Sequence, residues 1–175
     1  TDNGIKLFVD GVEFDSDREA SIEQAVDADV PPVDWDRWGA VDREAVLEPY
    51  RTRVANYARS HGAAPGSLTV AVDCGNGMAS VATPQVLRDL GATVEPINSH
   101  VDGRFPGRAS KPTPETIGDL RRFVAAGPAT VGFAHDGDAD RAVVVDQSGA
   151  VVHEDTIVAI LAEHYVRTSD VAHPI

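Results

Sequence analysis

Positive charge is scarce in this sequence of 175 residues. Lys6 and Lys111 are its only lysines, and the formal net charge is -13 at pH 7. Partners with dense negative charge, such as nucleic acids and acidic membrane surfaces, are bound mainly through lysine and arginine. The composition therefore argues against both kinds of partner.

Cysteine and long apolar runs are also scarce. Cys74 is the only cysteine, which excludes an internal disulfide and is typical of a reducing compartment. No stretch approaches the roughly 20 apolar residues that a membrane-spanning helix needs. The polar opening residues, Thr1 to Asn3, do not resemble a signal peptide. We therefore expect a cytoplasmic protein with no membrane partner.

Acidic residues, in contrast, are abundant, and most of them are aspartate. Asp and Glu together number 28 against 15 for Lys and Arg, and arginine supplies nearly all of the positive charge. We interpret this pattern as that of a protein from a high-salt cytoplasm. Near 1 M salt the Debye length is about 3 Å, so repulsion between carboxylates is screened and a hydrated acidic surface keeps the protein in solution. We expect a halophilic protein whose fold loosens at low salt.

The chain divides near Trp38, where a proline-containing linker, residues 31–38, follows a short first part. The first part, residues 1–38 with the linker, is too small to bury a core of its own and is predicted to be an incomplete α/β segment. We interpret Trp35 and Trp38 as packing anchors. The elements predicted here are strands over residues 5–9 and 12–14 around an Asp10-Gly11 turn, and a helix over residues 17–26 with Ser16 and Glu19 as its capping box.

The second part, residues 39–175, alternates between segments of helical periodicity and short β-branched runs. This alternation predicts a three-layer α/β/α domain with a mostly parallel sheet. The predicted strands cover residues 68–72, 93–97, 130–134 and 142–145. Four helices are predicted. The first has Leu47, Tyr50, Val54 and Tyr57 on one face, and the second covers residues 78–90. The third opens at Pro114 and contains Ile117, Leu120 and Val124, and the fourth contains Ile157, Ile160 and Leu161.

Three aspartates at alternate positions, Asp136, Asp138 and Asp140, lie between the last two predicted strands and are followed by Arg141. Three carboxylates confined to one small turn repel each other by about 3 kcal/mol per pair at an effective dielectric near 20. A divalent cation would neutralise this cluster, and carboxylate oxygens suit Mg²⁺ or Ca²⁺ rather than zinc. The loop is therefore a candidate metal site.

Two other interpretations of the aspartate loop compete with a catalytic metal site. An EF-hand also begins with alternating aspartates, but Arg141 stands where that loop needs glycine and Gln147 where it needs a bidentate glutamate. A solvated acidic hairpin tip would need no metal at all. The buried strands predicted on either side would hold the carboxylates on a rigid base, which favours the metal site.

A glycine-containing turn, Gly75-Asn76-Gly77, lies between a predicted strand and a predicted helix, where open α/β sheets often bind phosphates. A dinucleotide fingerprint would have a third glycine where Ser80 stands. It would also have an acidic residue at the end of the second strand, but Glu95 lies inside that strand. We therefore favour a tight structural turn over a nucleotide site.

Together with several other segments, the aspartate loop resembles the α-D-phosphohexomutases, the family of phosphoglucomutases and phosphomannomutases. The loop Asp136-Gly137-Asp138-Ala139-Asp140-Arg141 is similar to that family's metal loop. The resemblance spans nearly the whole chain. The other similar segments, in family order, are Asn3-Gly4-Ile5-Lys6, Val72-Asp73-Cys74-Gly75-Asn76-Gly77, Asp102-Gly103-Arg104-Phe105-Pro106 and Lys111-Pro112-Thr113-Pro114-Glu115.

The resemblance implies roles for particular residues. In the family the three aspartates bind Mg²⁺ together with a phosphoserine, which implies Asp136, Asp138 and Asp140 as the ligands here. It also implies that Lys6 is the active-site lysine that assists proton movement near the transferred phosphate; the alternative is a strand lysine facing solvent. We assign Arg141 to phosphate or substrate contact, because its fork-shaped cation can neutralise phosphoryl oxygens; the alternative is a salt bridge to the neighbouring aspartates.

The resemblance further implies that the chain is an internal fragment of a larger enzyme. Residues 1–38 would be the end of the family's first domain with a linker, and residues 39–175 its second domain. The parent enzyme would interconvert hexose 1-phosphate and hexose 6-phosphate through the phosphoserine and a bisphosphate intermediate. We expect the fragment alone to be inactive, and its severed edges to promote self-association.

Two alternatives remain from other functional classes. One is a noncatalytic acidic α/β module whose aspartate loop binds Ca²⁺ for structure, in which case mutation of Lys6 would change nothing. The other is a Rossmann-like nucleotide binder, which would use the Gly75 to Gly77 turn and be indifferent to the aspartate loop.

Overall fold

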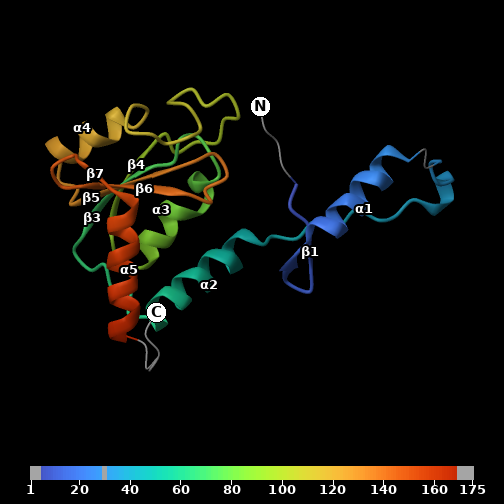
Figure 1. Ribbon diagram of the computed structural model, residues 1–175, viewed down its shortest axis with the longest axis horizontal. Coiled ribbons are helices and arrows are strands. Elements are labelled where there is room, and N and C mark those ends of the chain that lie inside the picture. Colours follow the sequence, from blue (N-terminus) through green and yellow to red (C-terminus); the bar gives the residue numbers. More distant parts are fainter. Residues whose placement is uncertain (1–4, 29–30, 169–175) are drawn as a thin grey trace. The chain divides into compact units, whose positions relative to one another are not determined.

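The computed structural model describes residues 5–28 and 31–168 of the chain (Figure 1). The chain forms two compact units, with the boundary between Arg43 and Glu44. None of the described helices is long and apolar enough to cross a membrane.

The first unit contains the predicted hairpin and helix. The two short strands pair antiparallel, and Asp10 and Gly11 form the turn with positive φ angles of 51° and 80°. The helix that follows has no buried residue, in agreement with the prediction that this part lacks a core of its own. The elements are β1 (Phe8–Val9), β2 (Val12–Glu13) and α1 (Ser16–Asp27).

The start of α1 and the linker both differ from the sequence predictions. Asp15 is the N-cap, since its carboxylate accepts the backbone N–H of Arg18 at 3.0 Å; the predicted capping by Ser16 is wrong. The linker forms one 3-10 turn, η1 (Trp35–Arg37). Trp35 is 82% exposed and Trp38 is 74% exposed, so neither ring is the packing anchor that the sequence predicted.

The second unit contains a five-stranded sheet in the order β4-β3-β5-β6-β7. β3 pairs in parallel with β4 and β5, β6 runs antiparallel to β5, and β7 runs antiparallel to β6. All strands except β6 therefore point the same way, and the predicted mostly parallel sheet is confirmed. The strands are β3 (Thr69–Asp73), β4 (Thr93–Ile97), β5 (Val131–His135), β6 (Ala142–Asp146) and β7 (Val151–Val152), of which β7 was not predicted.

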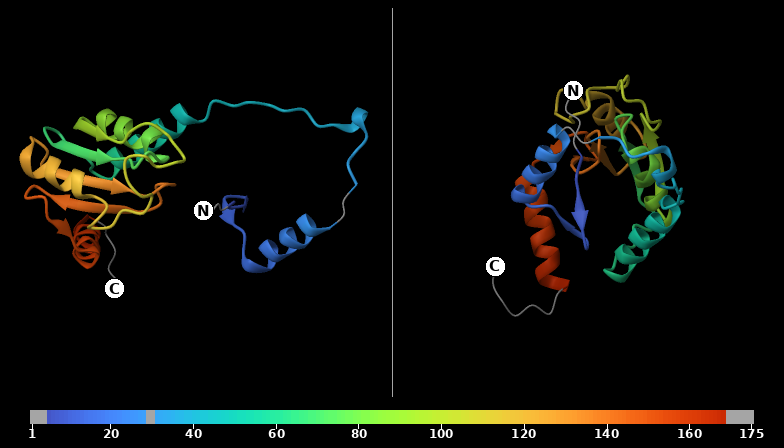
Figure 2. Two further views of the ribbon diagram at one scale, coloured as in Figure 1. Left: turned by 90° about the horizontal axis from the view of Figure 1, so that it is seen from above. Right: turned by 90° about the vertical axis from the view of Figure 1, so that its right-hand side faces the viewer.

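Helices cover both faces of this sheet and complete the predicted three layers. On one face, α4 (Gly118–Ala126) buries Leu120 and Val124 in a cluster with residues of β3, β5 and β6. On the other face, α3 (Ala79–Asp89) packs beside β4, and its Ala79 joins a second cluster with residues of β3 and β4. Figure 1 shows α4 above the sheet and α3 below it, and α4 lies in front of the sheet in the left view of Figure 2.

The helix α2 (Leu47–Ser60) packs against α3. Its buried residue is Ala55, and of the predicted apolar face only Val54 is partly buried, whereas Leu47, Tyr50 and Tyr57 are exposed. The predicted face is therefore wrong. The small Ala55, rather than the large apolar side chains, marks the buried face of α2.

The last two helices form at about the predicted positions in the sequence. α4 was predicted to open at Pro114 but begins at Gly118, because residues 113–116 form a separate turn in which the Thr113 N–H donates to Thr116 Oγ1 at 2.8 Å. α5 (Glu154–Thr168) follows β7, and its Ile157 is partly buried while Ile160 and Leu161 are exposed.

Candidate metal centre

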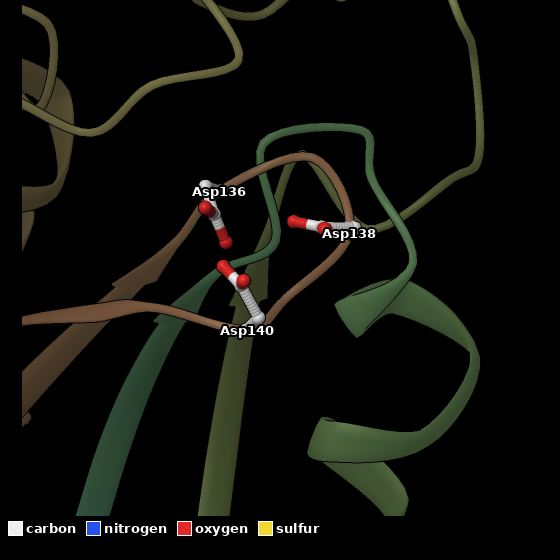
Figure 3. Close-up of side chains that lie close together, drawn as sticks. All are labelled: Asp136, Asp138 and Asp140. Atoms are coloured by element: carbon white, nitrogen blue, oxygen red, sulfur yellow. The ribbon is translucent and has the colours of Figure 1, made fainter. Parts of the chain in front are cut away.

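The loop between β5 and β6 brings Asp136, Asp138 and Asp140 together at the carboxyl end of β5 (Figure 3). Each offers one carboxylate oxygen, and these oxygens all lie within 4.8 Å of one another. Asp136 is buried at the base of the loop, whereas Asp138 and Asp140 are exposed. Figure 3 shows the three carboxylates pointing toward a common space. The structure thus brings together the three residues that the sequence singled out.

The loop has a tight backbone with one unusual residue. Ala139 has a φ of 66°, a left-handed conformation that costs a residue with a side chain about 1–2 kcal/mol. Its N–H donates to the carbonyl of Asp136 at 3.3 Å, which closes the turn. A residue outside the loop holds Gly137 in place, because the Gly137 carbonyl accepts the N–H of Met78 at 2.9 Å. These bonds keep the aspartates on a folded rather than an extended loop.

The Gly75-Asn76-Gly77 turn lies directly against this loop. Gly77 has no room for a side chain, since a Cβ there would lie 2.4 Å from the carbonyl oxygen of Gly137. Asn76 is 1% exposed, its N–H donates to the carbonyl of Asn98 at 2.8 Å, and its Oδ1 accepts the N–H of Gly107 at 2.9 Å. These contacts are internal to the protein and fit the predicted structural turn.

A buried ion pair lies beneath the same loop. Arg108 Nε donates to Asp73 Oδ2 at 2.7 Å, and the two side chains are 4% and 1% exposed. Asp73 is the last residue of β3, and Arg108 belongs to the long segment between β4 and α4. The sequence motifs alone assign no role to Arg108. Arg104 instead pairs with Asp102 at 2.7 Å on the surface.

Arg141 is paired with the aspartates of its own loop. Its N–H and its Nε both donate to Asp136, at 3.1 and 2.7 Å, and Nε also donates to Asp140 at 3.2 Å. Burial raises the pKa of Asp136, but hydrogen bonds from the Arg141 backbone and side chain, together with the Asp140 side chain, outweigh it, so the pKa is lowered overall. Bonds to Asp136 and Asp140 raise the pKa of Arg141. Asp136 and Arg141 are therefore both charged at neutral pH, and the salt-bridge alternative for Arg141 is present in the structure.

Residues 48–149 match the family model for the phosphoglucomutase/phosphomannomutase α/β/α domain II. The chain belongs to the phosphoglucomutase/phosphomannomutase family. The match covers the second unit from α2 to the turn before β7 and includes the whole aspartate loop. It confirms the family that the sequence motifs indicated.

Individual relatives agree with this assignment. The chain is 41% identical over 161 residues to a probable phosphoglucosamine mutase of Methanopyrus kandleri, with 91% of this chain and 35% of the relative covered. It is 38% identical over 168 residues to a phosphopentomutase of Thermococcus kodakarensis, covering 95% of this chain and 36% of the relative. The chain thus spans about a third of the length of the curated relatives it matches.

A solved structure shows the same fold. A phosphoglucomutase/phosphomannomutase family protein from Burkholderia thailandensis superposes with a TM-score of 0.72 at 26% identity, covering 88% of this chain and 32% of that one. The α/β/α architecture is therefore that of the family.

The aspartate loop fits a divalent metal ion by its own geometry. Its three oxygen donors converge, and two of the carboxylates are exposed and accessible to an ion from solvent. An all-carboxylate donor set suits a hard cation such as Mg²⁺ or Ca²⁺. Neighbouring His135 is not part of this set: its Nδ1 lies 3.1 Å from the carbonyl of Arg141, and burial lowers its pKa, so the ring is neutral at pH 7.

Lys6, the predicted catalytic lysine, lies in the first unit. Its Nζ is 3.7 Å from Glu13 Oε1, and its side chain is 63% exposed. Asn3 and Gly4, which preceded it in the family-like segment, lie outside the described residues. The catalytic role of Lys6 therefore stays a prediction.

Cys74 is expected to be unreactive in the folded protein. It is 0% exposed, and burial, assisted by the charge of Asp73, raises the pKa of its thiol to about 11. At pH 8 roughly one thiol in a thousand would be ionised, and the thiolate is the reactive form. We expect labelling by a disulfide reagent at pH 8 to be far slower in buffer than in guanidinium chloride. Equal rates in the two solvents would contradict this burial.

Proposed function

We propose that this chain provides the metal-binding domain of a phosphosugar mutase, which moves a phosphoryl group between the 1- and 6-positions of a hexose. The observation that supports this most strongly is the convergence of Asp136, Asp138 and Asp140 in a chain of the phosphoglucomutase/phosphomannomutase family. The names of its relatives, phosphoglucosamine mutase and phosphopentomutase, point to the same class of reaction.

The proposed metal is Mg²⁺, held by Asp136, Asp138 and Asp140. When bound, the ion would supply positive charge beside a phosphorylated serine and so offset the charge that develops on the transferred phosphoryl group. The protein contributes the geometry. Hydrogen bonds from Arg141 hold Asp136 ionised in one orientation, while Asp138 and Asp140 are exposed to an ion from solvent.

Two cations complete the proposed chemistry. Both side-chain contacts of Arg141 to the aspartates use Nε, and its side chain is 66% exposed, so the terminal nitrogens of its guanidinium are available to a phosphoryl oxygen. We assign the proton movement to Lys6. In the first step the phosphoserine passes its phosphoryl group to the free sugar hydroxyl, which loses its proton. In the second step the other phosphate of the bisphosphate returns to the serine, and the released sugar oxygen regains a proton.

The substrate proposed is a hexose phosphate, and the relatives define which sugars must be compared with it. One relative is named for glucosamine and another for a pentose. The chain spans about a third of such relatives, so sugar preference is a matter for the whole protein.

An assay of the full-length protein that contains this chain tests the proposal. Glucose, mannose, glucosamine and ribose 1-phosphates would each be supplied with a trace of bisphosphate, in high and low salt. We expect conversion of a hexose 1-phosphate to the 6-phosphate with Mg²⁺, and its loss on chelation. Conversion of none of these sugars, combined with Ca²⁺ binding that raises Tm, would instead favour the noncatalytic calcium module.

A further inference from the structure

We propose that the buried Asp73–Arg108 pair positions the aspartate loop, by fixing the backbone at which β5 passes into Asp136. Arg108 is then a positioning residue for the metal site and touches neither metal nor substrate. The inference rests on the proposed metal function of the loop, and it adds two residues, both buried, that the aspartate motif does not contain.

The hydrogen bonds of the Arg108 guanidinium support this proposal. Besides its 2.7 Å bond to Asp73, Arg108 donates from one terminal nitrogen to the carbonyl of His135 at 2.5 Å and from the other to the carbonyl of Ala109 at 3.0 Å. His135 is the last residue of β5 and directly precedes Asp136. One rigid, planar cation thus links the carboxyl ends of β3 and β5 to the long segment that contains Arg108.

Asp73 is itself fixed on its other oxygen. Its Oδ1 accepts the N–H of Gly75 at 2.9 Å and the side-chain amide of Asn98 at 3.0 Å. The guanidinium also packs against Gly75, where a Cβ would lie 2.7 Å from an Arg108 terminal nitrogen. The pair therefore has a single geometry, set by the ends of β3 and β4 and transmitted to the carbonyl of His135.

This anchor and the Met78–Gly137 bond hold the backbone on both sides of Asp136. The carbonyl of His135 is held by Arg108 and that of Gly137 by the Met78 N–H at 2.9 Å. Asp136 is the buried member of the three aspartates, and the other two follow within the same loop. Loss of the His135 anchor should therefore disturb the convergence of all three carboxylates.

A buried ion pair is weak evidence for stability, since desolvation offsets most of its attraction. The pair is better explained by the positions that it fixes, because the Arg108 guanidinium bonds to Asp73, Ala109 and His135 in three segments of the chain. Residues that orient metal ligands without touching the ion commonly change metal affinity about 10- to 100-fold when mutated. A merely structural pair would change Tm and leave the affinity of the folded protein unchanged.

The test compares Arg108→Lys with wild type and with Arg121→Lys, in this chain at high salt. Lysine keeps the charge at position 108 but lacks the planar set of separate nitrogens with which Arg108 bonds Asp73 and His135 at once. Arg121 is a matched control, because its Nε donates to the carbonyl of Gly149 at 2.9 Å in a turn away from the aspartates. Two quantities would be measured below Tm: the Kd for Mn²⁺ by electron paramagnetic resonance, and amide hydrogen exchange in residues 136–142.

We expect Arg108→Lys to weaken Mn²⁺ binding about 10- to 100-fold and to speed exchange in the loop, and Arg121→Lys to do neither. A folded Arg108→Lys protein with wild-type affinity and wild-type exchange would overturn the inference. If wild type binds no Mn²⁺, the proposed metal function fails, and exchange in the metal-free loop still decides whether Arg108 positions it. If Arg108→Lys does not fold, the double variant Asp73→Asn with Arg108→Gln removes both charges together and takes its place in both measurements.

Discussion

Replacing Asp138 by asparagine in the full-length protein is expected to lower kcat/KM for phosphosugar interconversion about 10³-fold, or about 4 kcal/mol of transition-state stabilisation. The amide has nearly the same shape but loses the charge that would hold a divalent cation. Asp138 is exposed on the loop, so the change should leave the fold intact. Steady-state kinetics with saturating Mg²⁺ would measure the effect, and thermal unfolding would confirm the fold.

Asp119→Asn is the matched control for this experiment. Asp119 is an exposed aspartate in the first turn of α4, where it pairs with Arg122 on the surface. Exposed ion pairs contribute little, so we expect activity within twofold of wild type. Full activity in Asp138→Asn would contradict the proposed role of the aspartate loop. A full loss of activity in Asp119→Asn would show that the effect is not specific to the loop.

The aspartate loop could be predicted from the sequence because its signal is local. Alternate aspartates between two β-branched runs define both the chemistry and the rigid base, and the structure brings their oxygens within 4.8 Å of one another. The central strands could be predicted for the same reason, since β3, β5 and β6 are short runs composed mainly of apolar residues. β7 is two residues long and leaves no such pattern.

The Asp73–Arg108 pair could not be predicted, because its partners are 35 residues apart and no periodicity relates them. A signal was present in hindsight. Asp73 directly follows the buried run Val70–Val72, and a charge that continues a buried strand needs a partner. The long loop that follows β4 contains two arginines, and only the fold selects Arg108 over the exposed Arg104.

Errors in helix faces and caps have a related cause. The large apolar residues of α2 suggested a face made by Leu47, Tyr50, Val54 and Tyr57, but α2 packs against α3 and its buried residue is the small Ala55. At α1 the prediction placed the N-cap on Ser16, one residue too late. Asp15 has the extended backbone conformation that the cap position requires, and its carboxylate accepts the N–H of Arg18.

Replacing Gly77 by alanine is expected to destabilise the second unit by about 3 kcal/mol and to lower its Tm by about 6–12 °C. The new Cβ would lie 2.4 Å from the carbonyl oxygen and 2.9 Å from the Cα of Gly137, and both are backbone atoms that no rotamer change can move. Relief requires the aspartate loop to shift outward. The bond from Met78 N–H to Gly137 would lengthen, and Mn²⁺ affinity should fall together with Tm.

Gly103→Ala provides the control, because an added Cβ at Gly103 meets no atom within 4 Å and the residue does not have a positive φ. Alanine is expected to be neutral there, or slightly stabilising through the lower entropy of the unfolded chain. Thermal unfolding and a Mn²⁺ titration of both variants would separate the two sites. An unchanged Tm and Kd in Gly77→Ala would mean that the close contact between Gly77 and Gly137 does not constrain the aspartate loop.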